Sequence, residues 1–522
     1  MTLFAVVVVH GNIYELPYRL DLITDGRPTI DTDQPHRRSL CHFTFLVNRV
    51  ESSAALTETL MTHAHHSSPA PASVPRTDPF FADSANDRVV RGPHHRRFLP
   101  PSQMFLIRMG LESYRRDHPG RPTFDASQGD GGASLGGIPH RELVEALDRF
   151  LPSVHATAYG TPQGDVRVRA AIFANYYRLS PDSGLTPDHV VLTDGGRDAL
   201  SKWYQAIQIL AGVSGDCLLT SAAPWISYGH GSYLAGLNLL CAPSTDGSFK
   251  ITPEGVKASI KFASQEVYRV RALVITTPDN PTGTFYTQEE VVELIQEATD
   301  CGLSQILVDL MYQTVLDDDH VRYDIPAILA ALSPEARRRV TFMDGLTKSA
   351  GASNVRHAHL LCGDLHMAKC LTAIASHTVL PNVLGEAAAF EVYGAEHPDQ
   401  HPWIRRVVEP TTKSRALFRA RMMGFDHRFV ADQGYYGFVH VAPWLERRVP
   451  DHLMFRDARD RVIETIHDTN DLVAYLTARH GLAVVPGAPF HQPEFIRFSL
   501  ANTPDYTGAA VVRFNEALHA LE

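Results

Sequence analysis

The sequence predicts an α/β fold of three layers, in which helices cover both faces of a mostly parallel central sheet. From about residue 100 onward, short apolar runs rich in β-branched residues alternate with amphipathic stretches of helical length. The runs show no alternation with polar residues, which is typical of parallel strands that are buried on both faces. A different composition before residue 99 indicates a separate N-terminal extension.

Six apolar runs are the predicted strands of this sheet. They are HVVLT (189–193), DCLLT (216–220), ALVITT (272–277), QILVD (305–309), VTFMD (340–344) and HLLCG (359–363). Helical stretches between them, such as residues 197–210 and 288–301, are long enough to connect parallel strands. Ligands of such folds gather beyond the carboxyl ends of the strands, so the residues after each run are candidates for a site.

Length, charge and cysteine content exclude several classes of protein. The 522 residues are enough for two or three domains. The 58 acidic and 48 basic residues give a net charge of −10, so we expect no binding to nucleic acid or to an anionic membrane. The six cysteines form no C-x-x-C pair, and no apolar run approaches the roughly 18 residues of a membrane span. We therefore expect a soluble, cytoplasmic protein.

Residues 1–98 form the predicted extension, and no function is assigned to them. FAVVVV and FTFLVN predict short strands, residues 52–62 predict a helix, and the tract 62–79, rich in Pro, Ser and Ala, is interpreted as a linker. His63, His65 and His66 lack a second ligand cluster at a suitable spacing, so no metal site is expected. Near the other end of the chain, the charged segment 445–468 is predicted to be a helical insertion at the surface.

Polar residues follow the predicted strands HVVLT and ALVITT. Gly195, Gly196 and Arg197 come after the first strand and open a helix, where backbone amides and the helix dipole favour an anion such as phosphate. A plain turn is the alternative interpretation. Asn280 follows ALVITT in the turn sequence Pro-Asp-Asn-Pro-Thr-Gly, and the proline after it holds it extended. Its side-chain amide is therefore expected to project from the strand end as a donor.

Two later strands end in residues that suit acid–base chemistry. Asp309 ends QILVD, with Tyr312 three residues on, and a buried carboxylate requires a cationic partner. A structural ion pair is the alternative for Asp309. Lys348, one of only seven lysines, follows a buried strand, where desolvation lowers the pKa of an ammonium group towards that of a neutral nucleophile. Arg356, eight residues later, suits bidentate binding of a phosphate.

Together these residues resemble the pyridoxal 5′-phosphate site of fold-type I enzymes. The chain from about residue 100 to 522 is similar to the aspartate aminotransferase superfamily, class I/II. The resemblance implies that Lys348 forms the internal aldimine and moves protons, and that Asp309 pairs with the protonated pyridine nitrogen. Asn280 and Tyr312 would hydrogen-bond the phenolic oxygen of the cofactor and lower the aldimine pKa.

The same resemblance assigns residues around the ring and the phosphate. Trp225 in APWISY matches the aromatic residue that stacks on the cofactor ring. The amides of Gly196 and Arg197, with the guanidinium of Arg356, would hold the phosphate. Many relatives also bind phosphate with a serine three residues before the lysine, where this chain has Gly345, and Thr347 would partly compensate. The Arg197 side chain would face either a larger substrate or solvent.

Two further matches concern the subunit partner and the substrate. Tyr159 in AYGTPQGDVRVR matches the tyrosine that reaches the cofactor phosphate of the neighbouring subunit, which implies a homodimer with shared sites. Arg497 in EFIRFSLA matches the arginine that binds the substrate α-carboxylate, next to Asn280. The implied α+β small domain comprises residues 99–150 and 415–522, and the large domain comprises residues 151–414.

The implied activity is transamination of an L-amino acid to a 2-oxo acid through aldimine, quinonoid and ketimine steps. The same cofactor-binding residues also serve lyases, cyclases, decarboxylases and condensing enzymes, which remain the main alternative. A regulator of the MocR type is a more remote alternative. Against it, residues 1–100 carry ten arginines and no lysine against ten acidic residues, and they show no helix-turn-helix pattern.

Overall fold

A computed structural model describes most of the chain after residue 102. The described residues are 2–9, 12–19, 89–90, 103–153, 158–211, 215–244, 247–266, 268–457 and 461–522. The chain divides into two compact units, Met1–Pro75 and Arg76–Glu522. In the first unit, β1 (Thr2–Val9) pairs antiparallel with β2 (Asn12–Arg19), so FAVVVV is a strand as predicted. FTFLVN, the predicted helix 52–62 and the tract 62–79 lie outside the described residues.

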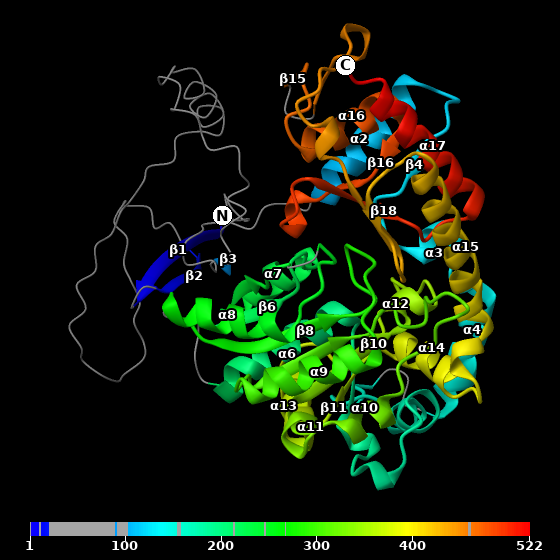
Figure 1. Cartoon of the computed structure of the whole chain (residues 1–522). Coiled ribbons are helices and arrows are strands. Elements are labelled where there is room, and N and C mark those ends of the chain that lie inside the picture. The colour runs from blue at the N-terminus through cyan, green and yellow to red at the C-terminus, as the bar shows by residue number, and fades with distance from the viewer. Residues whose placement is uncertain are drawn as a thin grey trace. The chain divides into compact units, whose positions relative to one another are not determined.

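The second unit is built around an eight-stranded sheet with the order β3-β7-β6-β8-β9-β10-β11-β5 (Figure 1). Its strands are β3 (Val89–Val90), β5 (Val190–Thr193), β6 (Cys217–Thr220), β7 (Asn238–Cys241), β8 (Val270–Thr276), β9 (Gln305–Asp309), β10 (Val340–Gly345) and β11 (Ala358–Cys362). The five strands from β7 to β10 in this order are parallel, whereas β3 and β11 are antiparallel to their neighbours. All six predicted runs are strands, and the mostly parallel sheet is confirmed.

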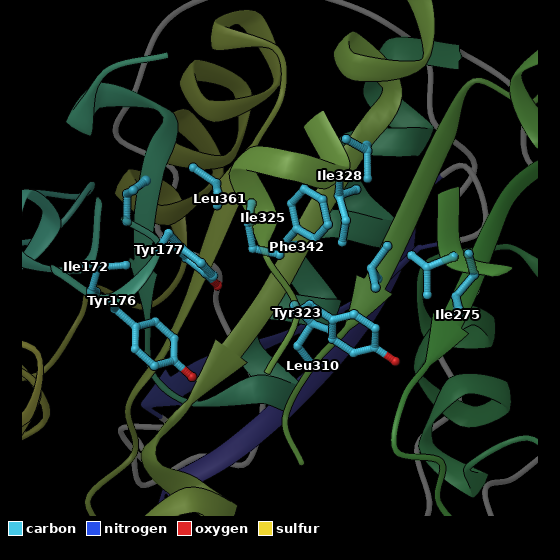
Figure 2. Packing of buried hydrophobic residues seen from close by; sticks show 14 of the residues in the cluster. Ile172, Tyr176, Tyr177, Ile275, Leu310, Tyr323, Ile325, Ile328, Phe342 and Leu361 are labelled. Carbon is cyan, nitrogen blue, oxygen red and sulfur yellow. The ribbon is translucent and has the colours of Figure 1, made fainter. Parts of the chain in front are cut away.

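Helices cover both faces of this sheet, which confirms the three layers. One face packs against α5 (Val166–Ala171), α8 (Pro253–Gln265), α9 (Gln288–Asp300), α10 (Ile325–Ala331), α11 (Pro334–Arg339) and α14 (Val383–Tyr393). The other face packs against α6 (Gly196–Ala211), α7 (Ile226–Leu234) and α13 (Leu365–His377). In the first core, Phe342 and Leu361 of the sheet lie near Ile325 and Ile328 of α10 (Figure 2).

Local sequence explains where the crossover helices begin. Helix α9 starts with a capping box in which the Thr287 hydroxyl accepts from the Glu290 amide and the Glu290 carboxylate accepts from the Thr287 amide. Its buried residues recur at helical spacing: Val291, Leu294, Ile295 and Ala298. The predicted helices 197–210 and 288–301 are therefore α6 and α9.

A second, smaller sheet lies in the C-terminal part of the chain. It has the order β12-β13-β18-β17, with β12 (Phe429–Val430), β13 (Tyr436–His440), β17 (Val485–Pro486) and β18 (Phe495–Ser499), all antiparallel. A parallel pair connects this part of the chain to a segment far earlier in the sequence: β16 (Leu482–Ala483) pairs with β4 (Phe124–Asp125). The accompanying helices are α2 (Gln103–Asp117), α15 (Pro402–Gly424), α16 (Thr469–His480) and α17 (Pro504–His519).

A third hydrophobic core combines residues from two distant parts of the sequence. It contains side chains of α2, β4 and the segment from residue 418 onward. This distribution supports our proposal of a small domain made from residues 99–150 and 415–522 beside a large domain of residues 151–414. Helix α4 (His140–Phe150), although inside the first of these ranges, buries Ala146 and Phe150 in the first core of the large sheet.

The prediction of a charged surface helix at residues 445–468 is wrong. In its described residues this segment forms a 3₁₀ turn, Asp451–Leu453, and the antiparallel pair β14 (Phe455–Arg456) and β15 (Val462–Ile463). Pro450 lacks the amide that a continuous helix requires. The buried side chains of Val449, Phe455, Ile463 and Ile466 belong to the third core. The spacing of these buried residues does not follow a helical repeat, so the segment buries them through short strands and turns instead of a helix.

The described residues include no helix that is long and apolar enough to cross a membrane. Over the same residues, no group of three or more His, Cys, Asp and Glu side chains is arranged to hold a metal ion. The histidines at 63, 65 and 66 lie outside this part of the chain.

Candidate active site

The carboxyl ends of neighbouring strands bring most of the predicted residues together. Gly196 begins α6 directly after β5, Asn280 follows β8, Asp309 ends β9, and Lys348 lies in the short helix α12 (Leu346–Ser349) after β10. In the parallel register, Asp309 is the partner of Thr276 on β8 and of Met343 on β10. The predicted residues therefore meet at one edge of the sheet, as the strand order requires.

Asp309 is a buried carboxylate without a cationic partner among the described residues. Its side chain accepts a hydrogen bond from the Tyr228 hydroxyl at 2.7 Å and one from the Met311 amide at 3.1 Å. Burial raises its pKa to about 6, although both hydrogen bonds act in the opposite direction. The alternative of a structural ion pair is therefore wrong. A cation bound beside this carboxylate would lower its pKa again and favour the ionised form.

Lys348 is half-buried and lies against three segments of the chain. Its Nζ donates to the carbonyl of Gly129 and lies 5.9 Å from the ring centroids of both Tyr312 and Tyr435. The Tyr435 hydroxyl donates to the backbone carbonyl of Lys348. Within the described residues, Nζ forms no ion pair with a carboxylate. No ion pair has to be broken before this amine reacts with a carbonyl group.

A chain of hydrogen bonds links Tyr312, Asn280 and Arg497. The Asn280 amide donates to the Tyr312 hydroxyl at 3.3 Å, and its oxygen accepts from Arg497 Nη1 at 2.8 Å. Arg497 Nη2 donates to the carbonyl of Ser127 at 2.8 Å. The guanidinium carbon lies 4.4 Å from the ring centroid of Tyr436. The predicted carboxylate-binding arginine is thus held in place by neighbours from three segments.

Candidate donors to an anion gather where α6 begins. Arg356 donates to the carbonyl of Ser353 at 2.8 Å and, at 3.3 Å, to that of Asp194, next to the turn before α6. Its guanidinium lies so close to Gly195 that an added Cβ there would be 2.4 Å from Nη2, and Gly195 also has a φ of +87°. The Thr347 hydroxyl oxygen is buried without a hydrogen-bond partner among the described residues. Such donors suit a phosphate.

The backbone explains why a serine cannot stand at Gly345. A Cβ at this position would lie 2.5 Å from the carbonyl oxygen of His357 and 2.8 Å from the Cα of Ala358, because β10 and β11 approach closely here. Glycine is therefore required by the neighbouring strand. The unpartnered hydroxyl of Thr347, two residues later, supports the expectation that Thr347 compensates.

Trp225 caps α7 beside the start of α6. Its ring meets that of Tyr228 edge to face, with centroids 5.5 Å apart, and the Arg197 guanidinium carbon lies 5.8 Å from its centroid. Arg197 is exposed to solvent and forms no ion pair with the described residues. Trp225 thus joins the predicted group through Tyr228, the residue that donates to Asp309.

The structure does not bring Tyr159 into this group. Its side chain is 95% exposed and makes no hydrogen bond or ring contact with the described residues of its own chain. A role at a cofactor phosphate would therefore require a second subunit, as the resemblance implies.

Several residues of the site escaped the sequence analysis. Tyr228 ends the APWISY segment, three residues after Trp225, and its pattern there gives no sign of a contact with Asp309. Gly129 lies in the glycine-rich segment QGDGG, and Tyr435 and Tyr436 lie in GYYGF. The glycines in these two segments were the available signal, because glycine often marks a close approach of backbone to other groups.

The arrangement fits pyridoxal 5′-phosphate through three unsatisfied groups. Asp309 lacks a cationic partner, the Thr347 hydroxyl lacks a hydrogen-bond partner, and Arg497 Nε is buried without an acceptor, all within the described residues. A ring nitrogen, a phosphate and a substrate carboxylate would satisfy them in turn.

Comparisons with known proteins agree with this assignment. The sequence model of the family "Aminotransferase class I and II" matches residues 126–513. The aspartate aminotransferase of Geobacillus stearothermophilus is 28% identical over 388 residues, which are 73% of this chain and 88% of that relative.

Solved structures show the same fold. The aspartate aminotransferase of Rhizobium meliloti superimposes with a TM-score of 0.67 and 21% identity, covering 82% of this chain and 100% of that one. The Thermus thermophilus enzyme with maleate gives a TM-score of 0.65 and 21% identity, covering 80% and 97%. The chain therefore belongs to the class I and II aminotransferase family and is a pyridoxal-phosphate-dependent transaminase of fold type I.

Proposed function

We propose that this enzyme transfers the amino group of an L-amino acid to a 2-oxo acid at the site around Lys348 and Asp309. The observation that carries the proposal is the buried Asp309, which no described lysine or arginine neutralises, at the same sheet edge as Lys348. When bound, the cofactor supplies an electron sink for negative charge that develops at the substrate α-carbon. Every other requirement falls to side chains of the protein.

Each of these side chains has a definite task. Lys348 Nζ would be the group that holds the cofactor, and, once freed by the substrate amine, it would serve as the base for the proton of the α-carbon. Asp309 would stay ionised beside a cationic ring nitrogen, while Asn280 and Tyr312 would donate to the phenolic oxygen of the ring. Trp225 would stack on the ring.

The phosphate is assigned to the start of α6 and to α12. The amides of Gly196 and Arg197, the Thr347 hydroxyl and the Arg356 guanidinium would bind it. Support comes from the close approach of Arg356 to Gly195 and from the unpartnered Thr347 hydroxyl. We further propose a homodimer in which Tyr159 reaches the phosphate of the other subunit.

Arg497 is the proposed partner of the substrate α-carboxylate, with Asn280 beside it. The distal group of the substrate is proposed to be acidic, so aspartate is the first donor to examine. Two observations support this: the relatives named above are aspartate aminotransferases, and the exposed Arg197 guanidinium beside Trp225 forms no ion pair with the described residues. Among the described residues, no feature favours a lyase, cyclase, decarboxylase or condensing enzyme over a transaminase.

Replacing Lys348 tests the proposal directly. Lys348→Ala is expected to abolish both the visible absorption of the bound cofactor and the formation of 2-oxo acid, because no other amine lies in the cluster. Lys261→Ala, which removes an exposed lysine on α8, is the matched control and should keep both. Retention of absorption and activity in Lys348→Ala would refute the assignment.

A panel of donors distinguishes the reaction types. Purified enzyme is incubated with single amino acids, with and without a 2-oxo acid, and the release of oxo acid, ammonia and carbon dioxide is measured. Oxo acid that forms only with an added acceptor supports transamination. Ammonia or carbon dioxide released without an acceptor would instead assign the chain to the lyases or decarboxylases.

A further inference from the structure

A buried tyrosine on β13, Tyr436, occupies the centre of the cluster but has no role in the assignments above. Its ring lies under the Arg497 guanidinium, 4.4 Å from the guanidinium carbon to the ring centroid. Its hydroxyl oxygen is 3.2 Å from that of Tyr312. The side chain is 2% exposed. One residue therefore touches both the proposed carboxylate-binding group and the proposed donor to the cofactor.

The fold holds Tyr436 in this place from several directions. Strands β13 and β18 pair so that Phe438 is opposite Arg497, and Tyr436 lies two residues away on the same face. A Cβ at Gly129 would be 2.0 Å from the Tyr436 hydroxyl oxygen, and one at Gly283 would be 2.3 Å from the Tyr436 carbonyl oxygen. Both glycines are needed for these close approaches, Gly129 at the hydroxyl end of the ring and Gly283 at the backbone of Tyr436.

Counting protons gives the direction of the hydrogen bond between the two tyrosines. This step rests on the proposed function, in which the Tyr312 hydroxyl donates its single proton to the phenolic oxygen of the cofactor. Its oxygen must then act as the acceptor in the 3.2 Å contact with Tyr436. Tyr436 is consequently the donor. A hydroxyl that accepts one hydrogen bond becomes a stronger donor in the next.

The charges around the pair favour this direction. Burial alone would raise the pKa of Tyr436, but the positive charges of Lys348 and Arg497 lower it below its ordinary value, with Asp130 opposing them. Burial raises the pKa of Tyr312 well above its ordinary value. The more acidic hydroxyl is the better donor.

We propose that Tyr436 is a positioning residue that donates its hydroxyl proton to Tyr312 and supports the Arg497 guanidinium on the face of its ring. The hydroxyl acts on the cofactor only through Tyr312. The ring acts on the substrate only through Arg497. The two effects can be separated by substitution, because phenylalanine keeps the ring and leucine removes it.

The first measurement is the pH titration of the visible absorption of the cofactor-loaded enzyme without substrate. The hydrogen bond that Tyr312 donates to the phenolic oxygen lowers the pH at the midpoint of this titration. Because Tyr436→Phe weakens that bond, it should raise the midpoint by about half a pH unit. In a Tyr312→Phe background, the same substitution should add no further shift, because the acceptor is gone. Tyr114→Phe is the control: that hydroxyl is buried and has no partner in the described residues, and its ring stacks on His118. It should leave the midpoint unchanged.

The second measurement separates KM from kcat for the amino acid. Tyr436→Phe should keep KM within about twofold of wild type, whereas Tyr436→Leu should raise it about tenfold, because the cation–π contact with Arg497 is lost. An unchanged midpoint in Tyr436→Phe, a further shift in the Tyr312→Phe background, or an equal shift in Tyr114→Phe would overturn the relay. An equal KM in the phenylalanine and leucine variants would overturn the support of Arg497. Wild-type enzyme without any visible absorption would instead refute the proposed function.

Discussion

Arg497, the proposed partner of the substrate α-carboxylate, is oriented by contacts within the protein. Two of its nitrogens are committed, to the Asn280 oxygen and to the carbonyl of Ser127, each at 2.8 Å, while Nε is buried without a partner in the described part of the chain. The planar guanidinium is thereby oriented, and its ring contact with Tyr436 adds a second constraint. A lysine could supply the charge but not the plane.

Arg497→Lys is therefore expected to raise KM for the amino acid, lowering kcat/KM by about 100-fold, which is the loss of about 3 kcal/mol of charged hydrogen bonding. The visible absorption of the bound cofactor should stay as in wild type. Arg421→Lys, at an exposed position of α15, is the control and should leave the steady-state constants unchanged. An unaltered KM in Arg497→Lys would place the carboxylate elsewhere.

Among the structural elements, the glycine-rich segment 129–137 packs closely against the turn after α12. A Cβ at Gly132 would lie 2.2 Å from the carbonyl oxygen of Gly351, and Gly351 itself has a φ of +59°. Asp130 caps α3 (Gly131–Leu135) and also accepts from the Ser353 hydroxyl. This packing brings the carbonyl of Gly129 to Lys348 Nζ. The segment thus positions the lysine although it precedes it by more than 200 residues.

Gly132→Ala should force these two backbones apart, because the added methyl group has no space. We expect the free energy of unfolding to fall by about 1–3 kcal/mol and kcat/KM to fall with it, as measured by urea denaturation and steady-state kinetics. Gly424→Ala, at the exposed end of α15 where a Cβ meets nothing within 4 Å, should be neutral or slightly stabilising. Equal stability of Gly132→Ala and wild type would show that the two backbones leave room for a methyl group.

At the scale of the whole molecule, Tyr159 is a large aromatic side chain without a partner in the described residues of its own chain. Its side chain is 95% exposed in the single chain, which is unusual for a large aromatic residue. The segment carrying it leads into α5, whose cap Asp165 accepts from the amide of Arg167. We propose that the missing partner is the cofactor phosphate of a second copy, so that each active site is completed only in the dimer.

Hybrid dimers test this sharing of sites. Lys348→Ala and Tyr159→Ala chains are each expected to form dimers with little activity at limiting cofactor concentration. Co-expression of the two should restore about a quarter of the wild-type activity, because about half of the dimers are hybrids with one native site. Activity that stays at the level of the separate variants would show that Tyr159 does not serve a neighbouring site. The control pairs Lys348→Ala chains with chains that carry both Lys348→Ala and Tyr159→Ala. No activity should be restored in these dimers.

Much of the fold and part of the site could be predicted because the relevant signals are local. Each of the six apolar runs is a strand because an uninterrupted apolar segment must be buried on both sides. Strand β7 was missed, although its four residues, NLLC, form a strand as long as β5 and β6. The direction of β11 was also beyond prediction, since a strand buried on both faces has the same composition in either direction. The segment 445–468 was misjudged because its charges concealed four buried apolar side chains.

The order of polar residues along the chain was sufficient to place Asn280, Asp309 and Lys348 at one sheet edge, since parallel strands align their carboxyl ends. Their partners depend on approaches between segments far apart in the sequence. Tyr228 meets Asp309, Gly129 meets Lys348, and Tyr436 meets Tyr312 and Arg497. A local pattern carries no information about such distances, because they are set by how closely glycine-containing backbones pack when the whole chain is folded.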